Sequence, residues 1–230
     1  VAIGATDNNG TGSFTGHVRI YEYSNSSWTQ LGSDIDGEAA DDFSGYSVSM
    51  NSAGDRVAIG ATDNNGTGSF TGHVRMYEYS NSSWIQLGSD IDGEAAHDRF
   101  GASVSVNSAG DRVAIGATLN DGTGNNAGHV RMYEYSNSSW TQLGSDIDGE
   151  AADDHFGISV SMNSAGDRVA IGAQYNDGAG NMAGHVRVFN LNTYVPDDNF
   201  EQALIDLGYD DVLDNYVITD SINTVTTLDV

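Results

Sequence analysis

Acidic side chains gather in one short stretch that occurs twice in the chain. The sequence SDIDGEAADD stands at 33–42 and again at 145–154. Closely spaced carboxylates in a glycine-containing loop are typical ligands of a hard cation such as calcium, which takes about six to eight oxygens. The stretch contains part of such a loop, but it lacks the third early ligand and the spaced glutamate of an EF-hand.

Two interpretations of these acids remain open. In the first they bind calcium, and in the second they only form turns and keep the surface solvated. The candidate calcium ligands are Asp34, Asp36, Glu38, Asp146, Asp148 and Glu150. In the middle copy of the stretch, His97 replaces one of the later acids. Calcium is the cofactor that this pattern suggests.

One histidine recurs in the segment GHVR, as His17, His73, His129 and His185. A metal or catalytic site built from these residues would require them to converge. A repeat that arranges its units around an axis keeps them apart. We therefore predict that each is a hydrogen-bonded residue at the start of a strand.

A catalytic site requires an acid, a base or a nucleophile that departs from the repeat and meets others in a pocket. The departures lie in loops and form no recognisable set of this kind. They are His97, Arg99, Leu119, His155 and Tyr175. We therefore predict that the chain is not an enzyme. A hydrolase domain elsewhere in a longer parent protein is compatible with this prediction.

The excess of acidic over basic residues limits the kinds of partner that the chain can bind. The 230 residues include 33 acidic and eight basic residues, all of them arginine, for a formal net charge of −25. Such a surface repels phosphate backbones and anionic membranes, which argues against a nucleic-acid partner. The chain has no cysteine, and no apolar run reaches the roughly 20 residues of a membrane helix. We therefore predict no membrane insertion.

The elements that must position these residues recur with a fixed period. Copies of VAIGA begin at Val1, Val57, Val113 and Val169, which are 56 residues apart. One unit contains four runs of strand-forming residues, YSVSM, RVAIGA, HVRMYEY and SWIQLGSDI, separated by turn-forming residues. Four strands joined by such segments predict an antiparallel sheet.

The pattern of apolar residues indicates that both faces of this sheet are buried. In the third strand, Val74 and Met76 point to one side, and Tyr77 and Tyr79 to the other. Four-stranded units with this period are typical of β-propeller blades. The tryptophan that opens each fourth run is predicted to pack between blades. The fold class is therefore all-β, a partial β-propeller over residues 1–192, and the incomplete first and last units predict an open arc or part of a larger ring.

The segments FGASVSVNSAGDRVAIGA at 100–117 and FGISVSMNSAGDRVAIGA at 156–173 join FG to GA across two strands. In this they resemble the FG-GAP repeat, the blade unit of integrin-alpha-like propellers, especially as it occurs in secreted bacterial surface proteins. The resemblance covers about residues 1–190. It departs in the first junction, where Ser44 separates Phe43 from Gly45. It also departs in the loop NSAGDR, whose single acid is too few for the calcium site that the family carries between its first two strands.

The repeat ends near residue 190, and residues 193–230 predict a different unit. The segment PDDNFEQALIDLG predicts a helix that ends at Gly208, and INTVTTLDV at 222–230 approximates the rhythm of a leucine-rich repeat. These segments resemble the helical cap and first strand of a leucine-rich array. We expect further blades and further leucine-rich repeats in a longer parent chain, because the sequence begins inside a repeat and without an initiator methionine.

Two functions follow from these resemblances. The first is a non-enzymatic extracellular or bacterial cell-surface module for adhesion, with a protein or glycan partner. The second is a structural spacer made of near-identical blades. A binding module should vary its exposed loops between blades. The loop 63–71 copies the loop 7–15, whereas 119–127 and 175–183 diverge, which favours binding slightly.

Overall fold

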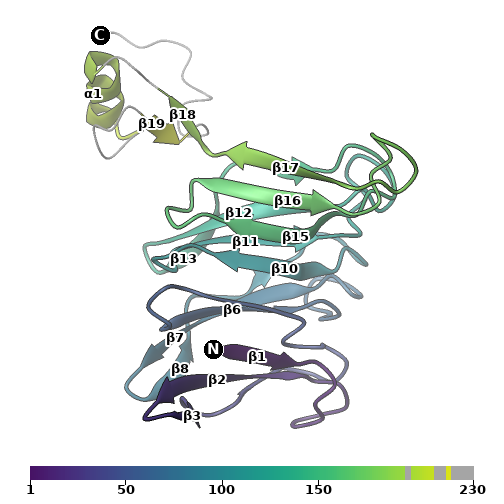
Figure 1. Cartoon of the computed structure of the whole chain (residues 1–230), viewed down its shortest axis with the longest axis vertical. Coiled ribbons are helices and arrows are strands. Elements are labelled where there is room, and N and C mark those ends of the chain that lie inside the picture. Colours follow the sequence, from purple (N-terminus) through teal and green to yellow (C-terminus); the bar gives the residue numbers. More distant parts are fainter. Residues whose placement is uncertain (195–197, 210–215, 219–230) are drawn as a thin grey trace.

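The computed structural model of the chain describes residues 1–194, 198–209 and 216–218. Four antiparallel sheets follow one another in sequence order and stack along the long axis of the molecule (Figure 1). The first and last of these sheets lie at opposite ends of the stack, so they form an open arc. The predicted partial β-propeller fold is confirmed.

We call the four sheets blades one to four. Blade one contains β1 (Ala2–Ala5), β2 (His17–Ser24), β3 (Ser27–Gln30) and β4 (Ile35–Asp36). Blade two contains β5 (Ser47–Met50), β6 (Arg56–Ala61), β7 (His73–Ser80), β8 (Ser83–Gln86) and β9 (Ile91–Asp92). Blade three contains β10 (Phe100–Val106), β11 (Arg112–Ala117), β12 (His129–Ser136), β13 (Ser139–Gln142) and β14 (Ile147–Asp148). Blade four contains β15 (Phe156–Met162), β16 (Arg168–Ala173) and β17 (His185–Asn190).

The segment predicted as one fourth strand is split into two. In blade two, β8 and β9 both pair antiparallel with β7, β8 at its end and β9 at its beginning. Between them, the Leu87 amide donates to the Met76 carbonyl at 2.8 Å, and Gly88 then takes a φ of +80°. This left-handed conformation, which glycine adopts without strain, turns the chain out of the ladder. The fourth strand is therefore interrupted but stays on one edge of the blade.

The recurring FG and GA dipeptides meet across the junctions between blades. A Cβ atom added to Gly116 of blade three would lie 2.1 Å from the carbonyl oxygen of Gly157 in blade four. The Ser103 hydroxyl donates to the same carbonyl at 2.7 Å. The junction between blades two and three has the same contacts. Glycine is therefore required because the backbones of adjacent blades touch.

The hydrophobic core is divided over the blade junctions. One cluster joins Ala58, Val74 and Met76 of blade two to Phe100 and Val113 of blade three. A second joins blade three to blade four, and a third joins blade one to blade two. Each blade therefore buries apolar side chains against the blades next to it, as the two-sided pattern of β7 predicts.

The first junction differs from the other two in its aromatic residue. Ser44 occupies the buried position that Phe100 and Phe156 hold one and two periods later. Phe43 lies one residue earlier and stacks on Phe14, with 5.6 Å between the ring centroids. The broken FG dipeptide therefore moves an aromatic ring from the core to the loops.

The tryptophans pack between blades, as predicted, except at the first blade. Trp140 is 8% exposed and its indole donates to the Leu87 carbonyl of the preceding blade at 2.8 Å. Trp84 makes the same bond to Leu31. Trp28 is 58% exposed.

We expect Trp140→Phe to lower the free energy of unfolding by about 1–2 kcal/mol, because it leaves the Leu87 carbonyl without its indole donor. The matched change Trp28→Phe should have no measurable effect. Urea denaturation of both variants measures the difference. Equal losses would show that the bond between blades does not stabilise the fold.

A different sheet follows the last blade. β18 (Asn192–Tyr194) pairs with β19 (Tyr216–Ile218), and α1 (Asp198–Asp206) lies between them in the sequence. The helix is followed by Gly208, whose φ is +79° and whose amide donates to the Ile205 carbonyl, so the predicted stop is confirmed. The predicted boundary between 192 and 193 falls inside β18. Pro196 and the predicted leucine-rich strand 222–230 lie outside the described residues.

Candidate functional site

The side chains that depart from the repeat are carried by two sets of loops at one edge of the arc, to the right in Figure 1. One set joins the second and third strands of each repeat (6–16, 62–72, 118–128 and 174–184). The other leads from one blade to the next (37–46, 93–99 and 149–155). Backbone bonds join the sets: the His97 amide donates to Ser69, and the Asp153 amide to Asn125. We call these loops together the loop edge.

Three of the departures, His97, Arg99 and His155, each contact another side chain of the loop edge. The rings of His155 and Tyr175 lie 5.0 Å apart, and those of Phe70 and His97 lie 5.5 Å apart. The Arg99 guanidinium lies 3.8 Å from the Asp63 carboxylate. The structure therefore brings together residues that the sequence left scattered. The large apolar or aromatic side chains that stay exposed on these loops are Phe14, Tyr46, Phe70, Tyr175 and Met182.

The loop edge also contains strained backbone. Phe14, Phe70 and Met182 occupy one position of the repeat, and all three adopt a φ between 50° and 54°. This left-handed conformation costs a bulky residue about 1–3 kcal/mol. An Asn or Asp side chain five residues earlier holds it, as when Asn65 Oδ1 accepts a hydrogen bond from the Phe70 amide at 2.9 Å. The loops are therefore fixed in a conformation that their residue types disfavour.

A cavity of about 280 Å³ opens at the loop edge beside blade four. Its lining includes His155, Tyr175 and Met182, with Asp153 and Asp177 as acidic groups. It combines aromatic, imidazole and carboxylate groups within one concave surface.

Buried carboxylates fasten the two sets of loops at the loop edge to each other. Asp98 is 4% exposed and accepts a hydrogen bond from Asn120 of the next blade at 2.9 Å. Asp154 is bound in the same way by Asn176 at 2.8 Å. Burial raises the pKa of Asp98, and the bond from Asn120 opposes this effect. These acids therefore position the loops and face away from solvent.

The predicted calcium ligands are divided between neighbouring junctions. Asp34 accepts bonds from Arg19 and Gln30 of its own blade, and the bonds from Arg19 lower its pKa. Glu38 instead reaches the next blade, where it lies 3.5 Å from Arg75. The Asp36 carboxylate lies 4.0 Å from His17.

The last copy of the stretch is divided in the same way. Asp146 binds Arg131 and Gln142 of its own blade, whereas Glu150 binds Arg187 of blade four at 3.1 Å. The Asp148 carbonyl accepts a bond from Arg187. One stretch therefore does not gather its carboxylates around a single point, and calcium binding by these residues stays a prediction.

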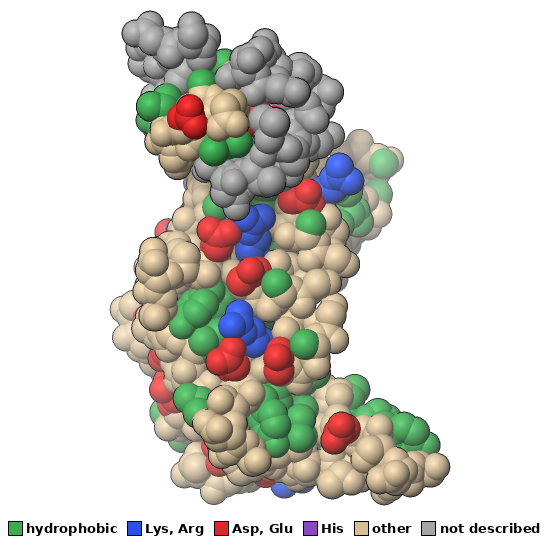
Figure 2. Space-filling view, turned by 90° about the vertical axis from the view of Figure 1, so that its left-hand side faces the viewer, with side chains coloured by type: hydrophobic (Ala, Val, Ile, Leu, Met, Phe, Trp, Pro, Cys, Tyr) green, Lys and Arg blue, Asp and Glu red, His purple; other side chains and the backbone are tan. Residues whose placement is uncertain are grey.

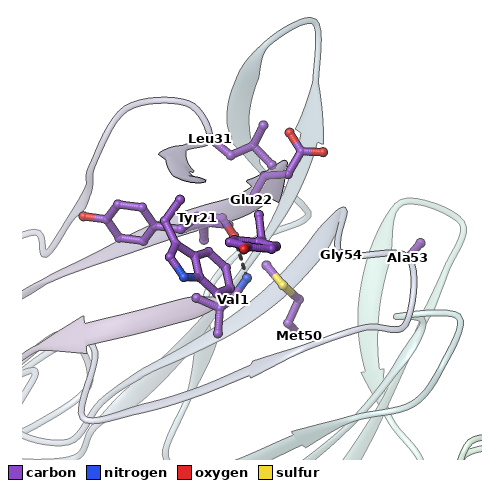
Figure 3. A pocket seen from close by; sticks show the side chains of 10 residues that line it. Val1, Tyr21, Glu22, Leu31, Met50, Ala53 and Gly54 are labelled. Carbon is purple, nitrogen blue, oxygen red and sulfur yellow. Dashed lines mark hydrogen bonds between the residues drawn. The ribbon is translucent and has the colours of Figure 1, made fainter. Parts of the chain in front are cut away.

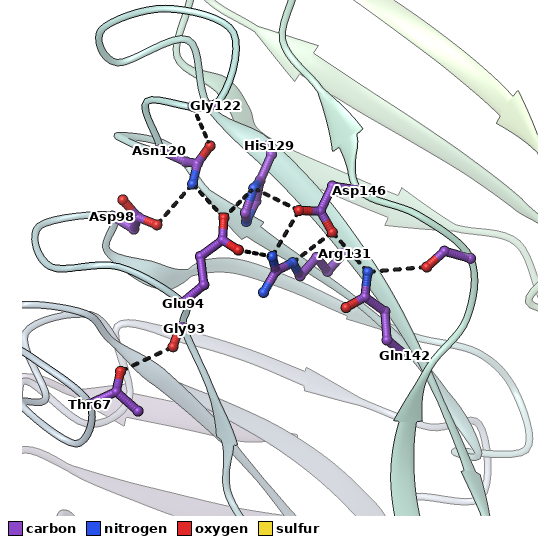
Figure 4. A network of polar contacts seen from close by, with 11 residues as sticks. Thr67, Gly93, Glu94, Asp98, Asn120, Gly122, His129, Arg131, Gln142 and Asp146 are labelled. Carbon is purple, nitrogen blue, oxygen red and sulfur yellow. Dashed lines mark hydrogen bonds and ion pairs between the residues drawn. The ribbon is translucent and has the colours of Figure 1, made fainter.

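The histidines of GHVR have a different environment from the one predicted. His129 is 1% exposed, and its Nδ1 atom has no hydrogen-bond partner among the described residues. Its nearest carboxylate oxygens, of Glu94 and Asp146, are each 3.7 Å away (Figure 4). Burial lowers the pKa of His129, as does the neighbouring Arg131, whereas the two carboxylates raise it. The prediction of a simple hydrogen-bonded residue is therefore wrong for His129.

A second cavity, of about 360 Å³, lies between blades one and two (Figure 3). Val1, Tyr21, Trp28 and Met50 are among its lining residues. At the next junction the equivalent space holds the side chain of Arg56, which lies under the Tyr135 ring and donates to the Gly110 carbonyl. The cavity is lined by Glu22 and Gly54, which correspond to Glu78 and Gly110, the residues that bind Arg56 at the next junction.

Charges on the opposite edge neutralise one another. Figure 2 shows basic side chains alternating with acidic ones along the face to the left of Figure 1. Arg56 pairs with Glu78 and Arg112 with Glu134, each at 2.8 Å.

A search of the described residues for a membrane-spanning helix, one long and apolar enough to cross a bilayer, finds none.

Solved structures resemble the chain in fold. A candidate 6-phosphogluconolactonase from Bacteroides uniformis ATCC 8492 matches with a TM-score of 0.52 and 10% identity, over 76% of this chain and 43% of that protein. Another from Bacteroides fragilis NCTC 9343 matches with a TM-score of 0.51 and 9% identity, over 76% and 44%. This chain therefore spans less than half the length of these structures. No curated protein matches the sequence.

These structures overturn the prediction that the chain is not an enzyme. That prediction rested on the departures from the repeat, which form no recognisable set of acid, base and nucleophile, and proteins with the same fold are candidate lactonases. A propeller can carry a few catalytic side chains on loops without altering its strands, so a regular framework does not exclude catalysis. At this identity the likeness itself shows the fold alone.

The sequence model of the FG-GAP repeat matches residues 91–133 and 146–189. Each matched segment begins in the last short strand of one blade, β9 or β14, and continues through the first three strands of the next. The sequence unit is therefore offset from the blade and spans a junction, where FG and GA meet. FG-GAP repeats are typical of extracellular propeller modules, and the two matches together with the stacked sheets support a β-propeller-like repeat fold.

Proposed function

We propose that the chain is an extracellular binding module that recognises a protein or glycan surface through its loop edge. The observation that carries the proposal is the location of the departures from the repeat. The strands RVAIGA are identical in blades two to four, whereas the loops at this edge differ in the residues that they expose. A framework that stays constant while its loops vary is the usual arrangement of a binding scaffold.

The chemistry of the loop edge is compatible with this function. Tyr175, Phe70 and Phe14 are each about 40% exposed, and aromatic rings contribute large, rigid contact areas to sugar rings and to protein side chains. Hydrogen bonds from the Phe14 and Phe70 amides to the Asn9 and Asn65 side chains restrain the backbone that carries these rings, which reduces the entropy lost on binding. With a net charge of −25, the module favours neutral or basic partners.

Binding to printed glycans and to immobilised extracellular-matrix proteins tests the proposal. We expect the chain to bind at least one of these ligands, and the double variant Phe70→Ala/Tyr175→Ala to weaken that binding by about tenfold or more. Tyr23→Ala is the control, because Tyr23 is 59% exposed and lies in the β2–β3 hairpin, away from the loop edge.

Two results would contradict the proposal. If the chain binds none of these surfaces, the blades serve as a spacer. If Tyr23→Ala weakens binding as much as the double variant, the partner is recognised at another surface. Urea denaturation of each variant separates loss of binding from loss of folding.

A further inference from the structure

Two junctions inside the arc each gather one histidine, one aspartate and one glutamate. The groups are Glu38, His73 and Asp90, and Glu94, His129 and Asp146. Within each group, one donor atom from every residue lies within 4.8 Å of the others. The histidine and aspartate come from one blade, and the glutamate comes from the loop that leaves the preceding blade (Figure 4).

The position of His129 Nδ1 indicates that the second group can hold a metal ion bound by nitrogen and oxygen ligands. Its buried Nδ1 lacks a hydrogen-bond partner among the described residues, and it points at Glu94 Oε1 and Asp146 Oδ2. The distance of 3.7 Å to each oxygen is too long for a hydrogen bond. It is close to the roughly 3.3–3.6 Å that separates two ligands of a tetrahedral zinc ion bound at about 2.0–2.2 Å.

The types of ligand atom in each group indicate which class of metal ion would bind there. An imidazole nitrogen with two carboxylate oxygens suits divalent transition metals such as zinc. Calcium takes six to eight oxygen ligands, and this group supplies two carboxylates and a nitrogen. The metal class therefore differs from the calcium that the acidic loops suggest.

Arg131 lies on the other side of the carboxylates. Its guanidinium donates to both oxygens of Asp146 at 2.8 Å and to Glu94 Oε2. Glu94 Oε1 accepts a bond from Asn120 at 2.9 Å and keeps a lone pair for the side of His129. The carboxylates of Glu94 and Asp146 carry two negative charges, and the Arg131 guanidinium carries one positive charge. A net charge of −1 therefore remains to attract a cation.

We propose that Glu94, His129 and Asp146 bind a divalent transition-metal ion, and that Glu38, His73 and Asp90 form a second site of the same kind. Each ion fastens one blade to the next, because its glutamate ligand comes from the preceding blade. His185 and Glu150 also lie close together, at 3.7 Å, but they have no aspartate partner among the described residues.

Titration of the full chain with zinc chloride after treatment with EDTA tests this proposal. Calorimetry should give two ions per chain, and the melting temperature should rise with zinc. The variants Glu38→Gln and Glu94→Gln should each lose one ion and part of that rise, and the double variant should lose both. Glutamine preserves the size of the side chain but removes the charge that attracts the ion. The matched control Glu150→Gln, at the same position of the repeat, should still bind two ions.

Cobalt(II) gives a second readout, because its visible absorption reports the ligands directly. Wild type and Glu150→Gln should show equal absorption, and Glu94→Gln should show about half. Absence of zinc binding would overturn the proposal and would mean that Arg131 alone neutralises the carboxylates. Zinc binding that Glu38→Gln and Glu94→Gln leave unchanged would also overturn it, because the ion would then sit elsewhere on the acidic surface. A larger rise in melting temperature with calcium than with zinc would overturn the proposal that the bound ion is a transition metal. None of these results depends on whether the loop edge binds a partner.

Discussion

Phe100→Ala is expected to lower the free energy of unfolding by about 3–5 kcal/mol. Phe100 is fully buried at the start of β10, where it packs in the cluster that joins blades two and three. Its ring meets Tyr133 edge to face, with 6.3 Å between centroids. Alanine removes this contact and leaves a cavity between the two sheets, which can relax only in part to fill it. The measurement is urea denaturation followed by tryptophan fluorescence.

Phe70→Ala is the control for this change. Phe70 has the same residue type but lies in a loop and is 40% exposed, so we expect a loss well below that of Phe100→Ala. Phe156→Ala should match Phe100→Ala, because Phe156 is fully buried one period later. Comparable losses at Phe70 and Phe100 would show that the junction core does not dominate stability.

Gly116→Ala is expected to destabilise the chain by about 3 kcal/mol, at the upper end of the usual cost of an extra buried methyl group. The new methyl would lie 2.1 Å from the Gly157 carbonyl oxygen of blade four. That oxygen belongs to backbone and cannot rotate away, so the two blades must move apart. Differential scanning calorimetry of the variant measures the loss.

Gly172→Ala provides a matched control in the same strand position of blade four. Its methyl would meet only Ser159, with the hydroxyl oxygen at 2.5 Å, and a hydroxyl can change its rotamer. We expect a loss below about 1 kcal/mol. If the two variants are equally destabilised, the cost arises within one sheet, and contact between blades is not the reason for the glycine.

Much of the fold could be predicted because the period of 56 residues can be read directly from the sequence. The alternation of Val74, Met76 and Tyr77 predicted a strand buried on both faces, and the structure confirms it. The split of the fourth strand was missed, because Gly88 could equally stand within a strand or outside it. The broken dipeptide at Ser44 was visible in the sequence, but its consequence, the stacking of Phe43 on Phe14, depends on how two loops meet.

The candidate sites were harder to predict because they form between units. Glu94 and His129 are 35 residues apart in the sequence and belong to different blades, so no local motif joins them. The signal was present as identity across copies, since GHVR and SDIDGE recur together in three units. The side chains that face His129 are Glu94 of the preceding unit and Asp146 of its own, and not the other histidines of GHVR. His97, Arg99, Leu119, His155 and Tyr175 were recognised from the sequence as departures from the repeat, whereas the exposed Met182 was not, and their position at one edge required the structure.

The junction contacts of Gly116 and Gly157 have a consequence for how such a chain changes length. Because blades two, three and four meet through equivalent atoms, loss or gain of one 56-residue unit by recombination between near-identical gene segments leaves the remaining interfaces intact. A closed ring tolerates only one copy number, since its last blade must meet its first. In the arc that residues 1–194 form, blades one and four lie at opposite ends, so each unit gained or lost changes the length of this stack by one blade.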